Sequence, residues 1–135
     1  MKYIKYLLIT LFFSCKTIEI TEIKKQIVTP GLPSGVIVLK YSGKFTTTEN
    51  TLIKSISVSG ISKPISTFTI TNLTDGLLLQ QNEILKKGEY YIEFKTDWKK
   101  ELENSIDTVK FITEINGKEK TISKVTTKNK DILMK

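Results

Sequence analysis

The sequence predicts an all-β protein of one domain. Its 135 residues leave room for a single domain of ordinary size. Isoleucine and threonine are abundant, and β-branched side chains fit the pleated surface of a sheet. Short stretches of alternating apolar and polar residues recur at spacings of ~8 to 12 residues, with turn residues between them. This spacing is typical of a sandwich or barrel, so we expect seven or eight antiparallel strands.

The first half of the chain contains three expected strands. Residues 36–45 alternate with the period of two that characterises a strand buried on one face. Residues 52–58 and 66–72 follow as further strands, and Gly60 separates them. The expected buried face of the strand at 52–58 consists of Leu52, Ile56 and Val58. Two prolines lie within residues 29–35, and we expect a kink or crossover there because proline fixes φ and lacks a donor.

The middle of the chain predicts two more strands and a polar connection. A short apolar strand at residues 77–80 follows the turn residues Asp75 and Gly76. Residues 89–95 alternate clearly, as in an antiparallel strand that faces water on one side. The inward residues of that strand are Tyr90, Ile92 and Phe94. The polar stretch 97–104 predicts a loop or a single helical turn that Asp97 would cap.

The strongest local signal is a hairpin close to the C-terminus. Residues 108–115 and 119–126 both alternate, and Asn116 and Gly117 lie between them. Both central residues of a type I′ turn need φ > 0, which Asn and Gly tolerate better than other residues. We therefore expect these two strands to pair in antiparallel fashion.

Residues 85–90 read Leu-Lys-Lys-Gly-Glu-Tyr. This segment resembles the Leu-x-x-Gly-x-Tyr tyrosine corner of immunoglobulin-like Greek-key β-sandwiches. The resemblance implies that the Tyr90 hydroxyl bonds back to main chain near Leu85, and that Gly88 adopts a conformation a side chain would hinder. The immunoglobulin cysteine pair is missing and Trp98 follows the corner, so the resemblance extends to architecture only. A transthyretin-like or lipocalin-like barrel is the alternative.

The N-terminal segment has the order of features found in a bacterial export signal. Lys2 and Lys5 precede an apolar run over residues 7–13, which is much shorter than the ~20 residues of a spanning helix. Residues 11–15 read Leu-Phe-Phe-Ser-Cys and resemble the lipobox of bacterial lipoproteins. The resemblance implies cleavage before Cys15 and attachment of fatty-acyl chains such as palmitate. With Arg and Ala absent, the chain resembles a lipoprotein of the Bacteroidetes type.

This interpretation divides the chain into four parts. Residues 1–14 are a lipoprotein signal peptide, and residues 15–34 hold the lipid anchor, a tether and a candidate first strand. Residues 35–127 form the β-sandwich domain, and residues 128–135 form a basic C-terminal tail. We then expect the protein at the bacterial outer membrane, held by its lipid on the periplasmic or cell-surface face.

The residue types narrow the chemistry that the chain can perform. One Cys and no His exclude an internal disulfide, a Cys/His zinc site and a His-based triad. Carboxylate pairs such as Glu89 with Glu93 would have to meet in a cleft to hydrolyse a sugar, and we interpret them as solvated faces. The net charge of +7 comes from lysines interspersed with acids, without Arg, so we expect no nucleic-acid partner. We expect no metal and no cofactor either.

The expected function is non-catalytic. A lipid anchor on a rigid sandwich without a catalytic set is typical of an accessory or protein-binding subunit of an outer-membrane or cell-surface assembly. Its partners would be the membrane and an envelope protein. The alternative is a carbohydrate-binding surface module, in which Tyr91 and Trp98 are the candidate glycan contacts. A small envelope hydrolase is a third hypothesis, and it requires two acidic side chains in one deep pocket.

One tripeptide indicates a modification. Asp107, Thr108 and Val109 together resemble the acceptor of Bacteroidetes periplasmic O-glycosylation. The resemblance implies that Thr108 is a candidate attachment site for a glycan.

Overall fold

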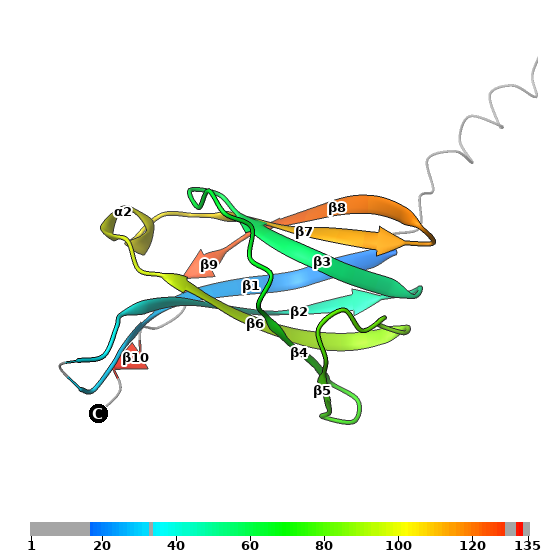
Figure 1. The fold of residues 1–135 in the computed structure, drawn as a ribbon, viewed down its shortest axis with the longest axis horizontal. Helices are drawn as coiled ribbons and strands as arrows, with labels where there is room; N and C mark the ends of the chain where they lie inside the picture. The colour runs from blue at the N-terminus through cyan, green and yellow to red at the C-terminus, as the bar shows by residue number, and fades with distance from the viewer. Residues whose placement is uncertain (1–16, 33, 129–131, 134–135) are drawn as a thin grey trace, which may run out of the picture.

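The computed structural model describes residues 17–32, 34–128 and 132–133. Their strands form two sheets that pack face to face (Figure 1). The all-β sandwich that the sequence predicts is therefore confirmed. No helix of the described residues is long and apolar enough to cross a membrane. The expected signal peptide, residues 1–14, and the expected lipid attachment site Cys15 lie outside the described residues.

The larger sheet is built around three long strands. In strand order it reads β10-β1-β2-β6-β4-β5, and β9 also pairs with β1. The pairs among β1, β2, β6, β4 and β5 are antiparallel, whereas β9 and β10 lie parallel to β1. Its strands are β1 (Ile18–Thr29), β2 (Val38–Thr47), β4 (Thr69–Asn72), β5 (Leu78–Leu79), β6 (Gly88–Asp97), β9 (Thr127–Lys128) and β10 (Ile132–Leu133).

The smaller sheet has the antiparallel order β3-β7-β8. Its strands are β3 (Thr51–Val58), β7 (Thr108–Ile115) and β8 (Lys118–Val125). Asn116 has φ of 52° and Gly117 has φ of 75°, as a type I′ turn requires. The predicted hairpin is confirmed. A short helix, α2 (Lys100–Glu103), comes before β7.

Aromatic rings form the centre of the core between the sheets. β2 and β6 are neighbouring strands of the larger sheet, and both bury aromatic residues on its inner face. β2 buries Tyr41 and Phe45, and β6 buries Tyr90 and Phe94. The Phe45 ring stacks on Tyr90 at 5.5 Å and meets the edge of Phe111, from β7, at 5.7 Å. Contacts of this kind hold one sheet against the other. The predicted inward residues of β6, Tyr90, Ile92 and Phe94, are buried.

Two β-bulges change the phase of the alternation. In β3 a bulge lies between Ile53 and Ser55, so Ile53 is buried with Ile56 while Leu52 is half-buried. The expectation that Leu52 shares the buried face is wrong, because a bulge inserts one extra residue into the strand.

The cap predicted for the helical turn is also wrong. Residue Lys99 caps α2 without a side-chain hydrogen bond, and Asp97 belongs to β6.

β1 belongs to the sandwich and not to a tether. Ile18, Ile20, Ile23 and Ile27 of this strand are buried in the core. A bulge between Ile20 and Glu22 explains why the buried positions change from even to odd numbers. The sandwich therefore starts well before residue 35, the expected boundary of the domain. At the other end of the chain, β9 and β10 line up beside β1 (Figure 1).

Candidate functional site

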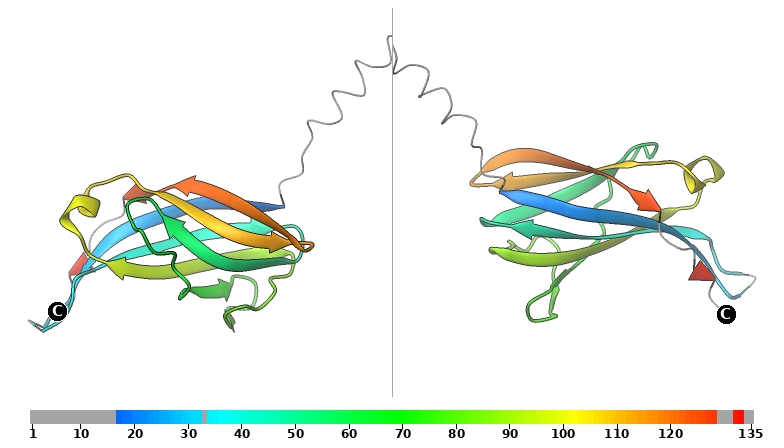
Figure 2. Two further views of the ribbon diagram at one scale, coloured as in Figure 1. Left: turned by 45° about the horizontal axis from the view of Figure 1, so that its top comes forward. Right: turned by 180° about the vertical axis from the view of Figure 1, so that it is seen from behind.

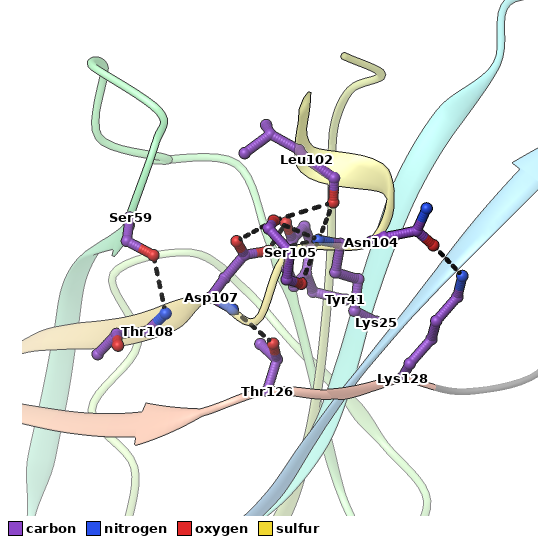
Figure 3. Close-up of polar contacts among 10 residues, drawn as sticks. All are labelled: Lys25, Tyr41, Ser59, Leu102, Asn104, Ser105, Asp107, Thr108, Thr126 and Lys128. Carbon is purple, nitrogen blue, oxygen red and sulfur yellow. Dashed lines mark hydrogen bonds and ion pairs between the residues drawn. The ribbon is translucent and has the colours of Figure 1, made fainter. Parts of the chain in front are cut away.

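A buried ion pair joins the two sheets near α2 (Figure 3). The Lys25 Nζ atom lies 2.7 Å from Asp107 Oδ2, and the two side chains are only 3% and 2% exposed. Lys25 comes from β1 in the larger sheet, and Asp107 lies directly before β7 in the smaller sheet. Removing two charges from water is costly, so a pair of this kind needs further hydrogen-bond partners.

The neighbouring groups supply those partners. The Lys25 ammonium also donates to the main-chain oxygens of Leu102 and of Ser105, the latter at 3.0 Å. The Asp107 carboxylate accepts hydrogen bonds from Tyr41 Oη at 2.9 Å and from Ser105 Oγ at 2.7 Å. Both carboxylate oxygens and the ammonium are thus hydrogen-bonded inside the protein. Two of the three partner residues come from the connection between β6 and β7, Leu102 from α2 and Ser105 just after it, which explains why this connection folds over the ion pair (Figure 3).

The main chain around Asp107 is equally constrained. Asp107 N donates to Thr126 Oγ1 at 3.0 Å, and Thr126 N donates to Asp107 O at 2.8 Å. One residue later, Thr108 N donates to Ser59 Oγ at 2.9 Å (Figure 3). These bonds attach the start of β7 to the segments that follow β8 and β3. The Lys25–Asp107 pair therefore sits in a rigid corner of the fold.

Tyr41 remains a hydrogen-bond donor over the whole physiological pH range. Burial, with the hydrogen bond and the charge of Asp107, raises the pKa of the Tyr41 hydroxyl well above its ordinary value. Its ring also stacks on Phe94 at 5.0 Å. The hydroxyl is consequently fixed in position and cannot act as a base near neutral pH.

The ion pair is sealed between the two sheets and is not exposed for chemistry. Asp107 is the one acidic residue buried in the described part of the chain, and its charge is matched by Lys25. Four surface hollows contain one acidic residue each, namely Glu19, Glu114, Glu93 and Asp97. Within the described residues no three side chains suited to bind a metal ion come together. The paired carboxylates that the hydrolase hypothesis requires are not assembled in any of these four hollows.

The hydrogen bond predicted for the tyrosine corner is present, but the special main-chain conformation predicted for Gly88 is not. Tyr90 Oη donates to Lys86 O at 2.5 Å, and buried Leu85 pairs through its main chain with Thr51 of β3. The chain thus crosses from the edge of the smaller sheet into β6 within a few residues. Gly88 has no left-handed φ, and a Cβ there would meet the nearest Tyr90 ring atom at 3.7 Å, an ordinary contact. The expectation that Gly88 needs a conformation closed to other residues is wrong.

The two candidate glycan contacts lie far apart. Tyr91 is half-buried on the outer face of β6, opposite Lys44 and Thr71 of the neighbouring strands. Trp98 follows the end of β6 and is 36% exposed. Seven residues of extended strand separate them by roughly 23 Å, since a strand rises about 3.3 Å per residue. The two rings cannot stack on the same sugar, and a glycan contact at either one stays a prediction.

The candidate acceptor Thr108 is half-buried at the start of β7. This strand is the central one of its sheet, and Thr108 pairs with Val125 of β8. The neighbouring Asp107 is occupied by the ion pair with Lys25. Glycosylation of Thr108 stays a prediction.

The structure contains a groove between β1 and β8 that the sequence patterns did not reveal. The groove encloses about 310 Å³ and is lined by residues 18–20 and 120–124; we call it the β1–β8 groove. The rear view of Figure 2 shows orange β8 beside blue β1. In the described part of the chain, β9 and β10 pair with the edge of β1 that faces β8, but only from Lys24 onward. Among the same residues, β8 pairs only with β7. Both walls of the groove therefore carry unpaired main-chain groups.

The side chains of β8 determine the chemistry of the groove. Lys120, Ile122 and Lys124 lie opposite buried residues of β7 and so project from the same face of the sheet, toward the groove. Ile122 packs against the core beside buried Ile18 and Ile20, whereas both lysines are exposed. The groove has an apolar floor with a cationic side chain on either side of Ile122.

Sequence reasoning missed both Lys25 and the groove. Lys25 lies between Ile23 and Ile27 with the spacing of a buried face, and that alternation is the signal that marks it as an inward lysine. The groove depends on which strand edges the topology leaves without a neighbour. No family model, curated protein or solved structure matches the chain.

Proposed function

We propose that the protein is a lipid-anchored, non-catalytic, protein-binding subunit of a bacterial envelope assembly, with an immunoglobulin-like sandwich as its folded part. The unpaired edge of β8 beside the β1–β8 groove is the single observation that carries the binding role. Exposed strand edges bind extended segments of other chains, because their main-chain donors and acceptors are already aligned. The lipobox-like residues 11–15 support the anchor.

The strand order supports the immunoglobulin-like architecture. With the two-residue strands β5, β9 and β10 set aside, the sheets read β1-β2-β6-β4 and β3-β7-β8. Immunoglobulin constant domains have the orders A-B-E-D and C-F-G, which correspond strand for strand. The position of the corner differs: Tyr90 lies near the start of the strand that corresponds to E, whereas the tyrosine of the immunoglobulin corner lies near the start of F.

An anchor at Cys15 would hold the groove close to the membrane. Three residues carry the chain from Cys15 to Ile18, which lines the groove, and three residues span on the order of 10 Å when fully extended. A partner bound there would itself sit at the membrane surface or in it. The proposal therefore concerns an envelope protein and not a freely diffusing one.

Photo-crosslinking in intact envelopes tests this proposal. We would place benzoylphenylalanine at position 124, on the groove, and at position 110 as the control. Lys110 is also exposed, but it lies on β7 opposite Ser57 and Ser123, away from the groove. We expect one reproducible membrane-protein adduct from position 124 and none from position 110. Adducts of equal pattern from both positions, or from neither, would contradict a binding role for this side of the sandwich.

A carbohydrate-binding module is the second candidate, favoured by the exposure of Trp98. A single exposed ring can stack on one sugar face, although the two-ring platform with Tyr91 does not form. Affinity electrophoresis through gels that contain envelope polysaccharide would test it. Retardation that is lost in Trp98→Ala and kept in Tyr91→Ala would support this candidate, and migration unaffected by the polysaccharide would remove it.

A further inference from the structure

We infer that the β1–β8 groove binds an extended acidic segment of the partner, which joins β8 as an additional strand. This inference rests on the proposed protein-binding function and adds the chemistry of the partner. It predicts a segment in which two acidic residues alternate with one apolar residue, in the pattern acidic-x-apolar-x-acidic.

The main chain makes β8 the best-placed edge. The outer edge of β3 is already bridged by Ile65 and Leu85, and β1 is joined by β9 and β10 over part of its length. β5, at the far end of the larger sheet, has only two residues. β8 offers eight residues and, within the described part of the chain, pairs with β7 alone. An added strand would pair with the main-chain groups that β8 presents on the side away from β7.

The side chains specify what the added strand carries. Residues that face each other across paired strands project on the same side of the sheet and come into contact. The positions opposite Lys120 and Lys124 would therefore favour carboxylates, and the position opposite Ile122 would favour an apolar side chain that also covers Ile18 and Ile20. The order lysine, isoleucine, lysine at every second position of β8 therefore predicts the order acidic, apolar, acidic at every second position of the partner segment.

Charge pairing inside this chain leaves the two lysines available. No carboxylate of the described residues lies within ion-pair distance of Lys120 or Lys124. Lys54, on neighbouring β3, already binds Glu114 at 3.0 Å and Glu119 at 3.8 Å. Lys120 and Lys124 therefore bring two unpaired positive charges to a groove whose lining holds a single acidic residue, Glu19.

The same lysines disfavour a second copy of the chain. If two β8 strands paired in antiparallel fashion about Ile122, Lys120 of each copy would face Lys124 of the other. Like charges directly opposite each other destabilise strand pairing, and inward-pointing lysines are a known means of protecting a sheet edge. The groove thus favours an acidic strand and disfavours pairing with β8 of a second copy of this chain.

Binding of designed peptides to the detergent-extracted full chain tests this inference. The probe is a fluorescein-labelled nine-residue peptide of threonines with glutamate, valine and glutamate at positions 3, 5 and 7. One control peptide carries lysine in place of glutamate, and another is N-methylated on the main-chain amides that would face β8. We expect saturable binding of the first peptide by fluorescence anisotropy, with at least about tenfold weaker binding of both controls.

Matched variants locate the site. Lys120→Glu with Lys124→Glu should weaken peptide binding at least about tenfold, whereas Lys95→Glu with Lys110→Glu should change it less than about twofold. Both double variants reverse two exposed lysines, and circular dichroism checks that each is folded. Equal loss in both variants, or full binding of the N-methylated peptide, would show simple charge attraction and overturn strand addition.

Two further outcomes separate this inference from the proposed function. Absence of saturable binding up to 1 mM peptide overturns the acidic-strand inference, while a specific membrane-protein adduct at position 124 would still support the binding function. A concentration-dependent dimer of the unsubstituted chain in sedimentation, tightened by Lys124→Glu because a carboxylate then faces Lys120 of the other copy, would identify a second copy as the occupant. That result would overturn the inference as well.

Discussion

Removal of the Asp107 carboxylate would leave the Lys25 ammonium buried between the two sheets. In Asp107→Ala the ammonium keeps the main-chain oxygens of Leu102 and Ser105 but loses its counter-charge at 2.7 Å. Tyr41 and Ser105 each lose the acceptor of a hydrogen bond. Because Lys25 is sealed from water, these losses cannot be compensated by hydration.

The expected cost is large relative to the stability of a small domain. Breaking a buried ion pair by removal of one partner typically costs ~3 to 5 kcal/mol. Single domains are stable by only ~5 to 15 kcal/mol, so the variant would lose a large share of its free energy of unfolding. Equilibrium unfolding in urea, followed by the fluorescence of the single tryptophan and by circular dichroism, measures this difference in the free energy of unfolding.

A variant that removes both charges separates the effect of an unpaired charge from simple loss of packing. Lys25→Met with Asp107→Leu removes both charges and keeps apolar volume in the corner. Since apolar replacement of a buried pair is often neutral or stabilising, we expect the double variant to be at least ~2 kcal/mol more stable than Asp107→Ala. A loss below ~1 kcal/mol in Asp107→Ala would refute the reasoning, because it would mean that water reaches Lys25.

Three further changes test other parts of the fold. Gly43→Ala should lower the free energy of unfolding by at least ~1 to 3 kcal/mol in urea titrations, because its Cβ would lie 2.1 Å from Glu22 O at the β1 bulge. Gly88→Ala should change it by less than ~0.5 kcal/mol, and a large loss there would contradict the ordinary contact at 3.7 Å. The raised pKa of Tyr41 stabilises the fold below pH ~10, the ordinary tyrosine pKa, and this contribution is lost as the pH rises above it. Tyr41→Phe should therefore lose less stability than the wild type between pH 9 and 11, and parallel losses would contradict the assignment.

The strands that sequence patterns predict correctly are those specified by local chemistry. β6 alternates apolar and polar residues along its length, and the Asn116–Gly117 turn needs left-handed conformations that few other residues adopt. The burial of Tyr90 and Phe94 follows directly from that alternation. Each of these features depends on residues that are neighbours in the chain.

The features that sequence patterns miss depend on distant partners. The bulge after Ile20 is matched by Gly43 on β2, which alone leaves room for the main chain of Glu22. Lys25 and Asp107 are 82 residues apart, and no local pattern joins them. The β1–β8 groove arises because the two sheets leave these strands unpaired, which is a property of the topology.

The proposed anchoring of the protein in the envelope depends directly on the chemical state of its N-terminus. Mass spectrometry of the protein extracted from the membranes of its native host measures this state. We expect a chain that begins at Cys15 and carries thioether-linked and amide-linked acyl groups, so that it partitions into detergent. A chain that retains residues 1–14, or one that begins elsewhere without acyl groups, would contradict an envelope-anchored binding subunit.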